Sequence, residues 1–267
     1  MTQRIFILAI VGVQALGLCA CGFSAEDNVL TRECVIGPDQ GATLMGRFPR
    51  MKIPIAVAAG QFSGDEARDI ENAVQTWNSF TRVSLGEEIF DMGGSSIRES
   101  SVAKPSNSRL CSTSLIDSRG EWVTTRQVVI YKSGTWNSSI PNAIAVTAVC
   151  RSGGSPFNRS YMASMDLNYQ NFFVDGRPIP DLRSIVTHEL GHLLGLDHSC
   201  TGDSGRNGFP SCSDSGINSD YLNAVMFPSV FFNNGLGEVR RALNINDQGR
   251  ANCLYQDISP AGQQQFD

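Results

Sequence analysis

The 267-residue sequence predicts one α/β layered domain. Most of the strand-like segments come before two C-terminal helices, and no internal repeat interrupts that order. Hydrophobic residues make up 41% of the chain, which is enough for one substantial core. The formal net charge is -5, and no cluster of Lys and Arg stands out. Without such a basic surface, nucleic acid is excluded as an expected partner.

Residues 1–20 have the composition of a signal peptide. Arg4 precedes an apolar run that is shorter than the roughly 20 residues needed to span a bilayer as a helix. We therefore expect cleavage and export. Cys21 follows the small residue Ala20, which resembles a bacterial lipoprotein signal and makes Cys21 the candidate for lipidation. That lipid would attach the protein to the outer membrane or cell surface, whereas an ordinary secretory signal would leave it periplasmic or secreted.

The remaining cysteines indicate a disulfide framework. An even number of cysteines in an exported chain predicts three disulfides. The six cysteines are Cys34, Cys111, Cys150, Cys200, Cys212 and Cys253. Cys200 and Cys212 lie in one polar, Gly- and Ser-rich loop, where a local crosslink would restrict the chain. They are therefore the pair that we expect first.

The composition along the chain divides it into a leader, a domain and a tail. Residues 21–45 form a leader or tether, residues 46–257 form the folded domain, and residues 258–267 form a C-terminal tail. Within the domain, residues 86–126 are rich in Ser, Gly and charge and predict a long irregular excursion. Residues 199–223 predict a second long loop.

The domain begins with a strand and a long helix. Alternate residues are apolar from Ile53 to Val57, which predicts a strand within residues 47–59. Ser63 is a typical helix N-cap, and apolar residues then recur every three or four positions up to about Arg82. These positions are Ile70, Ala73, Val74, Trp77 and Phe80. The apolar face of this helix is expected to lie on the sheet.

Three more strands and two helices follow. Residues 127–132 are rich in Val, Ile and Tyr and predict a strand, and residues 143–150 and 161–168 are two further strand candidates. A helix is expected over residues 182–194 and another over residues 246–255. This order completes the α/β domain.

All three histidines of the protein lie in the single segment HELGHLLGLDH. His188 and His192 are four residues apart, so on a helix both imidazoles project from one face and can share a metal ion. Gly195 stands one turn later, where a left-handed residue can end the helix and return His198 to the same ion. Glu189 is turned by about 100° from His188 and can approach a water molecule on the metal.

These residue types predict a catalytic zinc site. Three neutral imidazoles leave the fourth tetrahedral position of zinc open for water, whereas structural sites are closed. Zinc lowers the pKa of that water to about 7, so Glu189 can act as general base and then as general acid toward the departing amine. The pattern indicates a zinc-dependent endopeptidase that acts on protein or peptide substrates.

The extended motif, with Gly195 and His198, resembles the metzincin zinc proteases. A second segment, AVMFP around Met226, resembles the Met-turn of that family, in which the methionine forms an apolar floor beneath the metal. Ser199 directly follows the third histidine, as is typical of the matrixins, the matrix-metalloproteinase branch. The resemblance covers about residues 46–257 and is loose outside the two motifs.

The resemblance implies a fold and a mode of substrate binding. It implies a twisted, mostly parallel sheet of five strands with three main helices, and a zinc cleft below the edge strand. A substrate would lie extended along that edge strand, here between Ala143 and Val149. His188 and the segment after Met226 would line the pocket beside the zinc. Ser184 matches a position that often sets the depth of that pocket.

Two departures from the matrixins concern metal ions. Animal matrixins usually hold a second, structural zinc through further histidines, and this chain has no further histidine, so we expect one zinc ion. Calcium sites near Asp166 and Asp175 lack the spacing of a recognisable loop, and solvated carboxylates are the simpler interpretation.

Cys34 has two interpretations. The segment around Cys34 faintly resembles the matrixin cysteine switch, a thiolate that blocks the zinc until a pro-segment is removed. Its spacing from the following GPD is off by one, and a free Cys34 would leave an odd number of cysteines. The other interpretation is a structural disulfide, with Cys253 as a candidate partner.

Two further function classes compete with the endopeptidase. One is a lipid-anchored binding or adhesion module that keeps zinc without turnover, and the other is a zinc hydrolase of non-peptide amides. The intact Glu189 favours an enzyme, because a module without turnover has no chemical need for it. An open edge strand beside the cleft favours peptides as substrates.

Overall fold

The computed structural model describes residues 30–105, 110–111, 127–202 and 208–259. Residues 1–20 and Cys21 lie outside the described residues, as does most of the predicted tail. The elements, in chain order, are η1 (Gly41–Thr43), β1 (Ile53–Ala58), α1 (Gly64–Ser84), β2 (Phe90–Asp91), β3 (Arg98–Ser100), β4 (Val128–Ser133), β5 (Ala145–Ser152), β6 (Arg159–Asn168), α3 (Leu182–Leu194), α4 (Ser219–Leu222), β7 (Phe232–Asn233), β8 (Leu236–Gly237), α5 (Ile245–Tyr255) and η2 (Gln256–Ile258).

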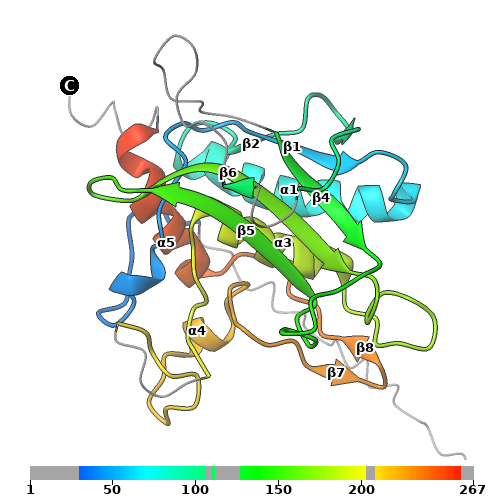
Figure 1. The fold of residues 1–267 in the computed structure, drawn as a ribbon. Helices are drawn as coiled ribbons and strands as arrows, with labels where there is room; N and C mark the ends of the chain where they lie inside the picture. Colours follow the sequence, from blue (N-terminus) through cyan, green and yellow to red (C-terminus); the bar gives the residue numbers. More distant parts are fainter. Residues whose placement is uncertain (1–29, 106–109, 112–126, 203–207, 260–267) are drawn as a thin grey trace, which may run out of the picture.

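The main sheet is mostly parallel, as predicted (Figure 1). Its order is β2-β1-β4-β6-β5, and β3 also pairs with β1. Strands β1, β4 and β6 run parallel, and β5 runs antiparallel to β6 at one edge. The family resemblance implied five strands. Within the described residues the sheet has six, and the sequence patterns located four of them. The difference arises in the predicted irregular excursion, whose short strands β2 and β3 both add to β1.

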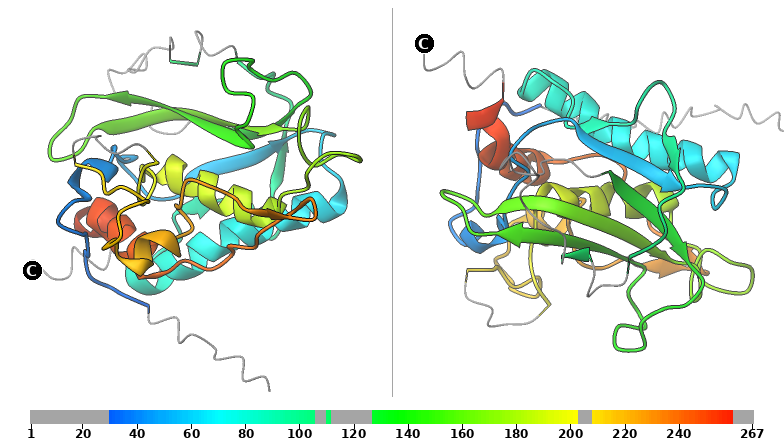
Figure 2. Two further views of the ribbon diagram at one scale, coloured as in Figure 1. Left: turned by 90° about the horizontal axis from the view of Figure 1, so that it is seen from below. Right: turned by 45° about the horizontal axis from the view of Figure 1, so that its top comes forward.

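The three long helices α1, α3 and α5 lie on the same side of the sheet (Figure 2). Helix α1 begins with the capping box of Ser63 and Glu66 and ends at Ser84, two residues beyond the predicted end. Its apolar positions from Ile70 to Phe80 are buried. The indole Nε1 of Trp77 donates a hydrogen bond of 2.9 Å to the carbonyl of Thr187 on α3. One core therefore joins α1, α3 and the sheet.

Helix α3 is buried along almost its entire length between α1 and the sheet. Asp181 caps its N-terminus by accepting a hydrogen bond of 2.9 Å from the backbone N–H of Ser184. The helix ends at Leu194, and Gly195 follows in the left-handed conformation. Both ends agree with the predicted helix over residues 182–194.

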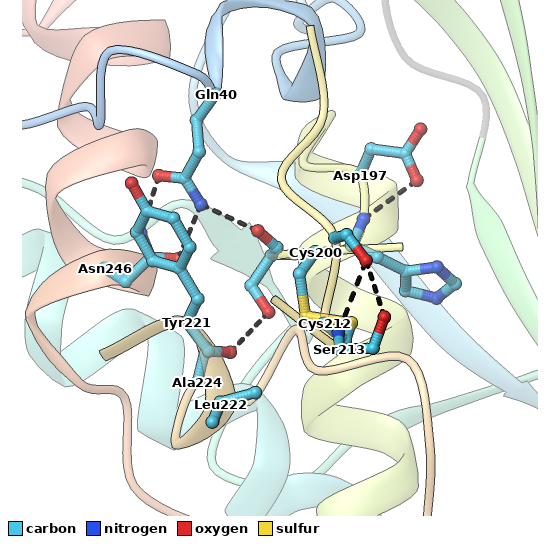
Figure 3. Close-up of a disulfide and its surroundings, with 12 residues drawn as sticks. Gln40, Asp197, Cys200, Cys212, Ser213, Tyr221, Leu222, Ala224 and Asn246 are labelled. Carbon is cyan, nitrogen blue, oxygen red and sulfur yellow. Dashed lines mark hydrogen bonds between the residues drawn. A yellow bond between two sulfur atoms is a disulfide. The ribbon is translucent and has the colours of Figure 1, made fainter. Parts of the chain in front are cut away.

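The described part of the predicted leader packs on the domain. Cys34 is bonded to Cys253 on α5, and Gln40 is fully buried. The side-chain amide of Gln40 donates to the carbonyl of Ser199 and accepts from Asn246 of α5 (Figure 3). The packed body therefore includes residues 30–45. The cysteine-switch interpretation of Cys34 is wrong, because its sulfur is in a disulfide.

The four other cysteines within the described residues pair as well. Cys200 is bonded to Cys212, as predicted, within the loop that follows the third histidine (Figure 3). Cys111 pairs with Cys150 on β5. Across the described residues, no helix is both long enough and apolar enough to cross a membrane.

Candidate metal centre

Helix α3 and the turn after it bring the three histidines together. His188 and His192 lie one helical turn apart on α3, and His198 follows the turn at Gly195. One ring nitrogen from each histidine lies within 4.8 Å of the others. The three side chains can therefore hold one metal ion, as their spacing predicted.

The turn at Gly195 depends on glycine for two reasons. Its φ angle of 107° is in the left-handed region, which other residues rarely adopt. A Cβ atom at this position would lie 1.7 Å from the carbonyl oxygen of Gly46. The adjacent Met45 donates its backbone N–H to the carbonyl of Gly195 at 2.8 Å. The start of the domain thus holds the turn that carries His198.

The hydrogen bonds of the two helical histidines fix their tautomers. His188 Nδ1 lies 2.7 Å from the carbonyl of Val225, and His192 Nδ1 lies 2.9 Å from the carbonyl of Leu196. A carbonyl can only accept, so each Nδ1 carries the proton and each Nε2 presents a lone pair. The two Nε2 atoms are 3.1 Å apart. Two lone pairs at this distance repel each other unless a cation lies between them, so the residues fit a bound metal ion.

Burial favours neutral imidazoles at this site. Burial and the charge of His192 lower the pKa of His188 to about 4, and burial lowers the pKa of His192. Both rings are therefore neutral at pH 7. Neutral imidazole is the form that binds a metal, so no proton has to be displaced near neutral pH.

Glu189 lies beside the histidines, and the edge strand contacts it. Its side chain is buried, and its Oε2 accepts a hydrogen bond of 2.6 Å from the hydroxyl of Thr147 on β5. Burial raises the pKa of Glu189, while His188 and Thr147 oppose that shift. Sequence reasoning did not identify Thr147. The signal available was one hydroxyl residue within the apolar stretch AIAVTAV.

Met226 packs against α3 at Gly191. It is fully buried, and its sulfur is 2.2 Å from where a Cβ of Gly191 would be. Glycine at position 191 therefore lets the Met226 thioether pack against the helix between the two histidines. The carbonyl of Met226 also accepts a hydrogen bond of 2.8 Å from the N–H of Ser199.

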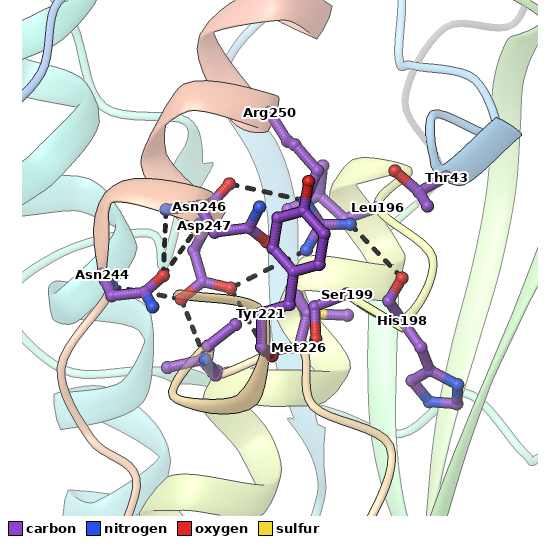
Figure 4. Close-up of polar contacts among 12 residues, drawn as sticks. Thr43, Leu196, His198, Ser199, Tyr221, Met226, Asn244, Asn246, Asp247 and Arg250 are labelled. Atoms are coloured by element: carbon purple, nitrogen blue, oxygen red, sulfur yellow. Dashed lines mark hydrogen bonds and ion pairs between the residues drawn. The ribbon is translucent and has the colours of Figure 1, made fainter. Parts of the chain in front are cut away.

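Two charged residues of α5, Asp247 and Arg250, hold the backbone of the Met226 segment and of the turn that carries His198 (Figure 4). The carboxylate of Asp247 accepts the backbone N–H groups of Val225 at 2.8 Å and Met226 at 3.1 Å. The guanidinium of Arg250 donates to the carbonyl of Asp197 at 2.9 Å. Both side chains are fully buried, and their closest charged atoms are 3.9 Å apart.

Burial shifts the pKa values of both Asp247 and Arg250. Burial lowers the pKa of Arg250 to about 10, so the guanidinium remains charged at pH 7. Burial raises the pKa of Asp247, which the field of Arg250 opposes. Sequence reasoning missed both residues, because the pattern of α5 does not reveal which loops lie against it.

A cleft of about 620 Å³ runs past the histidines. Strand β5, the edge strand of the sheet, borders it through Thr147, and Ala143 lines it just before the strand begins. The segment after Met226 lines another part of the cleft, as expected. Ser184 also lines it, and its hydroxyl accepts the backbone N–H of Arg240 at 2.7 Å. The residues that the resemblance assigned to a substrate pocket therefore line one cavity together with the histidines.

Asp166 and Asp175, where the sequence showed no recognisable calcium loop, do not belong to the histidine group. Asp166 is on β6, and its Oδ1 is 2.9 Å from the ammonium of Lys104. Burial raises the pKa of Asp166, which Lys104 opposes. Among the described residues, the histidine group is the one cluster of three or more ligand residues that could hold a metal, and it includes neither Asp166 nor Asp175.

No protein-family model matches the chain, and no curated protein shows significant similarity to it. The fold and the site define an α/β domain with a three-histidine centre that can hold a metal ion.

Proposed function

We propose that the protein is a zinc-dependent endopeptidase of the matrixin-like branch of the metzincins. The observation that carries this proposal is the position of Glu189. It lies beside three histidines whose ring nitrogens converge, in a cleft bordered by an edge strand. Three imidazoles suit zinc and leave one position for the reaction. When bound, zinc supplies a Lewis acid that polarises the peptide carbonyl and lowers the pKa of water.

Glu189 performs the proton transfers in this proposal. Its carboxylate takes a proton from the attacking water as the bond between that oxygen and the carbonyl carbon forms. It then gives the proton to the amine nitrogen as the C–N bond breaks. Thr147 holds the Oε2 atom of Glu189 through the bond of 2.6 Å, so the carboxylate keeps one orientation through both transfers.

Strand β5 supports a peptide substrate over a small amide. It pairs with β6 along one side and forms the edge of the sheet on the other, next to the cleft. An extended peptide can add to such an edge through backbone hydrogen bonds. The pocket that includes Ser184 and the residues after Met226 can then take one side chain of that peptide.

The disulfides support export. Three disulfides are stable in an oxidising compartment and uncommon in the cytosol. We propose a bacterial cell-surface or outer-membrane lipoprotein anchored through Cys21, which lies outside the described residues.

The test compares the mature protein with its Glu189→Gln variant on a mixed protein substrate, with zinc content measured in both. We expect both proteins to hold one zinc ion and the variant to lose at least about 100-fold in cleavage rate, a typical contribution of a general base. Glu99→Gln, at an exposed position on β3, is the matched control and should retain full activity.

Two outcomes would contradict the proposal. Equal cleavage by both proteins would show that Glu189 does not transfer the proton. Full zinc content without cleavage by the unsubstituted mature protein would instead support the lipid-anchored binding module.

A further inference from the structure

We propose that Arg151 forms a subsite for an acidic side chain of the substrate. Arg151 is on β5 and lines the cleft that contains the histidines. This inference rests on the proposed function, since it assigns a substrate class to the same cleft. The substrates would be polypeptides with an Asp or Glu a few residues from the cleaved bond.

Two arginines line the cleft, Arg151 and Arg240, and they differ in whether other groups of the protein pair with the guanidinium. Arg240 is neutralised: its Nε donates to Glu238 at 2.8 Å, and its Nη1 donates to the carbonyl of Ala224 at 3.1 Å. Its guanidinium also lies over the ring of Phe227, 4.7 Å from the centroid. These contacts use the guanidinium within the protein, so Arg240 offers little to a substrate carboxylate.

Arg151 has no such partners. Within the described part of the chain, its guanidinium makes no hydrogen bond and no ion pair, and its Nε is buried without a partner. Burial lowers the pKa of Arg151, and the field of Asp197 opposes that shift. A partly buried guanidinium with free donors is a favourable site for a carboxylate, which can accept two of its N–H groups at once.

The side chain is held in place by the chain beside it. A Cβ atom on Gly46 would lie 3.2 Å from the Cδ of Arg151, so the stem of Arg151 packs closely on that glycine. Gly46 in turn contacts the Gly195 turn. The aliphatic part of Arg151 is thus packed against a segment that also supports His198, and the residue lines the cleft.

The position of Arg151 along β5 sets the distance to the cleaved bond. Thr147, which contacts Glu189, is four residues earlier on the same strand, and both residues line the cleft, although the pairing of β5 with β6 shifts register between Cys150 and Arg151. At 3.3 Å per residue the separation is about 13 Å. An extended peptide beside β5 would therefore bring a residue about four positions from the cleaved bond to Arg151.

The negative net charge of the protein contrasts with the local positive charge of Arg151. The chain carries -5, so its overall field repels an acidic peptide. A preference for an acidic side chain must then come from a local contact. We expect that preference to be confined to one substrate position.

Binding of labelled peptide pools tests the inference without cleavage. The probes are fluorescein-labelled decapeptide pools that differ only in carrying Asp, Asn or Lys at one position, which is scanned along the peptide. Fluorescence anisotropy is measured with the zinc-loaded Glu189→Gln protein and with the same protein carrying Arg151→Gln or Arg151→Glu. Arg68→Gln, an exposed arginine on α1, is the matched control.

We expect the Asp pool to bind at least about tenfold more tightly than the Asn pool at one scanned position. Arg151→Gln should remove that difference, Arg151→Glu should transfer the preference to Lys, and Arg68→Gln should change nothing. A gain of Lys preference cannot result from misfolding. The absence of Asp preference in the parent protein, or its persistence in Arg151→Gln, would overturn the inference.

The same variants and peptide pools distinguish a failure of this inference from a failure of the proposed function. Cleavage of protein substrate by the unsubstituted enzyme without an Asp preference in the pools would overturn the subsite alone. Asp-selective binding through Arg151, combined with no cleavage by the unsubstituted enzyme, would overturn the endopeptidase and leave the subsite standing.

Discussion

Thr147 is the residue through which the edge strand contacts Glu189. Its hydroxyl is within 2.6 Å of the carboxylate, and a hydrogen bond to a charged group contributes about 1.5–3 kcal/mol. Valine has nearly the same shape as threonine but cannot donate. Replacing Thr147 with valine therefore tests whether this hydrogen bond orients the Glu189 carboxylate, with little change in side-chain shape.

We expect Thr147→Val to lower kcat by roughly tenfold or more, with KM almost unchanged, because in the proposed mechanism the bond orients Glu189 without binding the substrate. Thr147→Ser keeps the donor and should restore most of the rate. Steady-state kinetics on a cleaved peptide, with zinc content as a control, measures both. A rise in KM at constant kcat would instead assign Thr147 to substrate binding.

At the scale of elements, one ion pair ties the start of α1 to β4. Glu66 accepts hydrogen bonds of 2.7 Å from both Lys132 on β4 and Tyr169. Burial raises the pKa of Glu66, but the bonds from Lys132, Tyr169 and Ser63 outweigh it and lower the pKa to about 2. The folded protein therefore binds this proton less tightly than the unfolded chain does.

The sign of this shift gives a pH-dependent prediction. A depressed pKa stabilises the fold above the unfolded value of about 4.3, and that stability is lost as the pH falls toward about 2. Glu66→Gln should cost about 1 kcal/mol of unfolding free energy at pH 7, and the difference should vanish near pH 2. Urea unfolding at several pH values measures it, with Glu99→Gln as control. A cost independent of pH would mean that packing, not charge, is lost.

Helix α5 is the element that couples the two motifs. Asp247 holds the Val225 and Met226 N–H groups, and Arg250 holds the carbonyl of Asp197. Asp247 and Arg250 contact backbone N–H and carbonyl groups, which every residue other than proline has. The sequence around Val225 and Asp197 therefore contains no pattern that predicts these contacts. The position of α5 therefore aligns the Met226 segment with the His198 turn.

Across the whole molecule, the disulfides hold distant segments together. The Cys34–Cys253 bond joins residues that are 219 positions apart and fixes the N-terminal segment on α5. A crosslink that closes such a long loop restricts the unfolded chain strongly. Its effect should therefore appear in stability and not in control of activity.

We expect the Cys34→Ser, Cys253→Ser double variant to lose about 2–5 kcal/mol of unfolding free energy while its zinc content and kcat stay unchanged. Guanidinium unfolding and kinetics below the transition measure these quantities. The matched comparison is Cys200→Ser, Cys212→Ser, which closes a loop of only 12 residues and should cost less. Increased activity of the Cys34→Ser, Cys253→Ser variant would contradict this prediction and indicate an inhibitory role for Cys34.

The three-histidine group that can hold a metal ion was largely predictable because its geometry is local. The spacing of His188 and His192 along a helix, and the turn at Gly195, depend on backbone geometry within a few residues. The same holds for the alternation that marks β1 and the periodicity that marks α1 and α3. The short strands β2 and β3 were missed because their pairing with β1, and not their composition, makes them strands.

By itself, the sequence determined that a three-histidine site lies on a helix in an α/β domain, and that an acidic residue stands beside it. Tertiary structure decided which distant residues complete that site. Thr147 contacts Glu189 from β5, Asp247 holds the Met226 segment from α5, and Arg151 lines the same cleft. The physical reason is range: helical spacing follows from neighbouring residues, whereas contacts across the fold depend on how every packed element fills the same core.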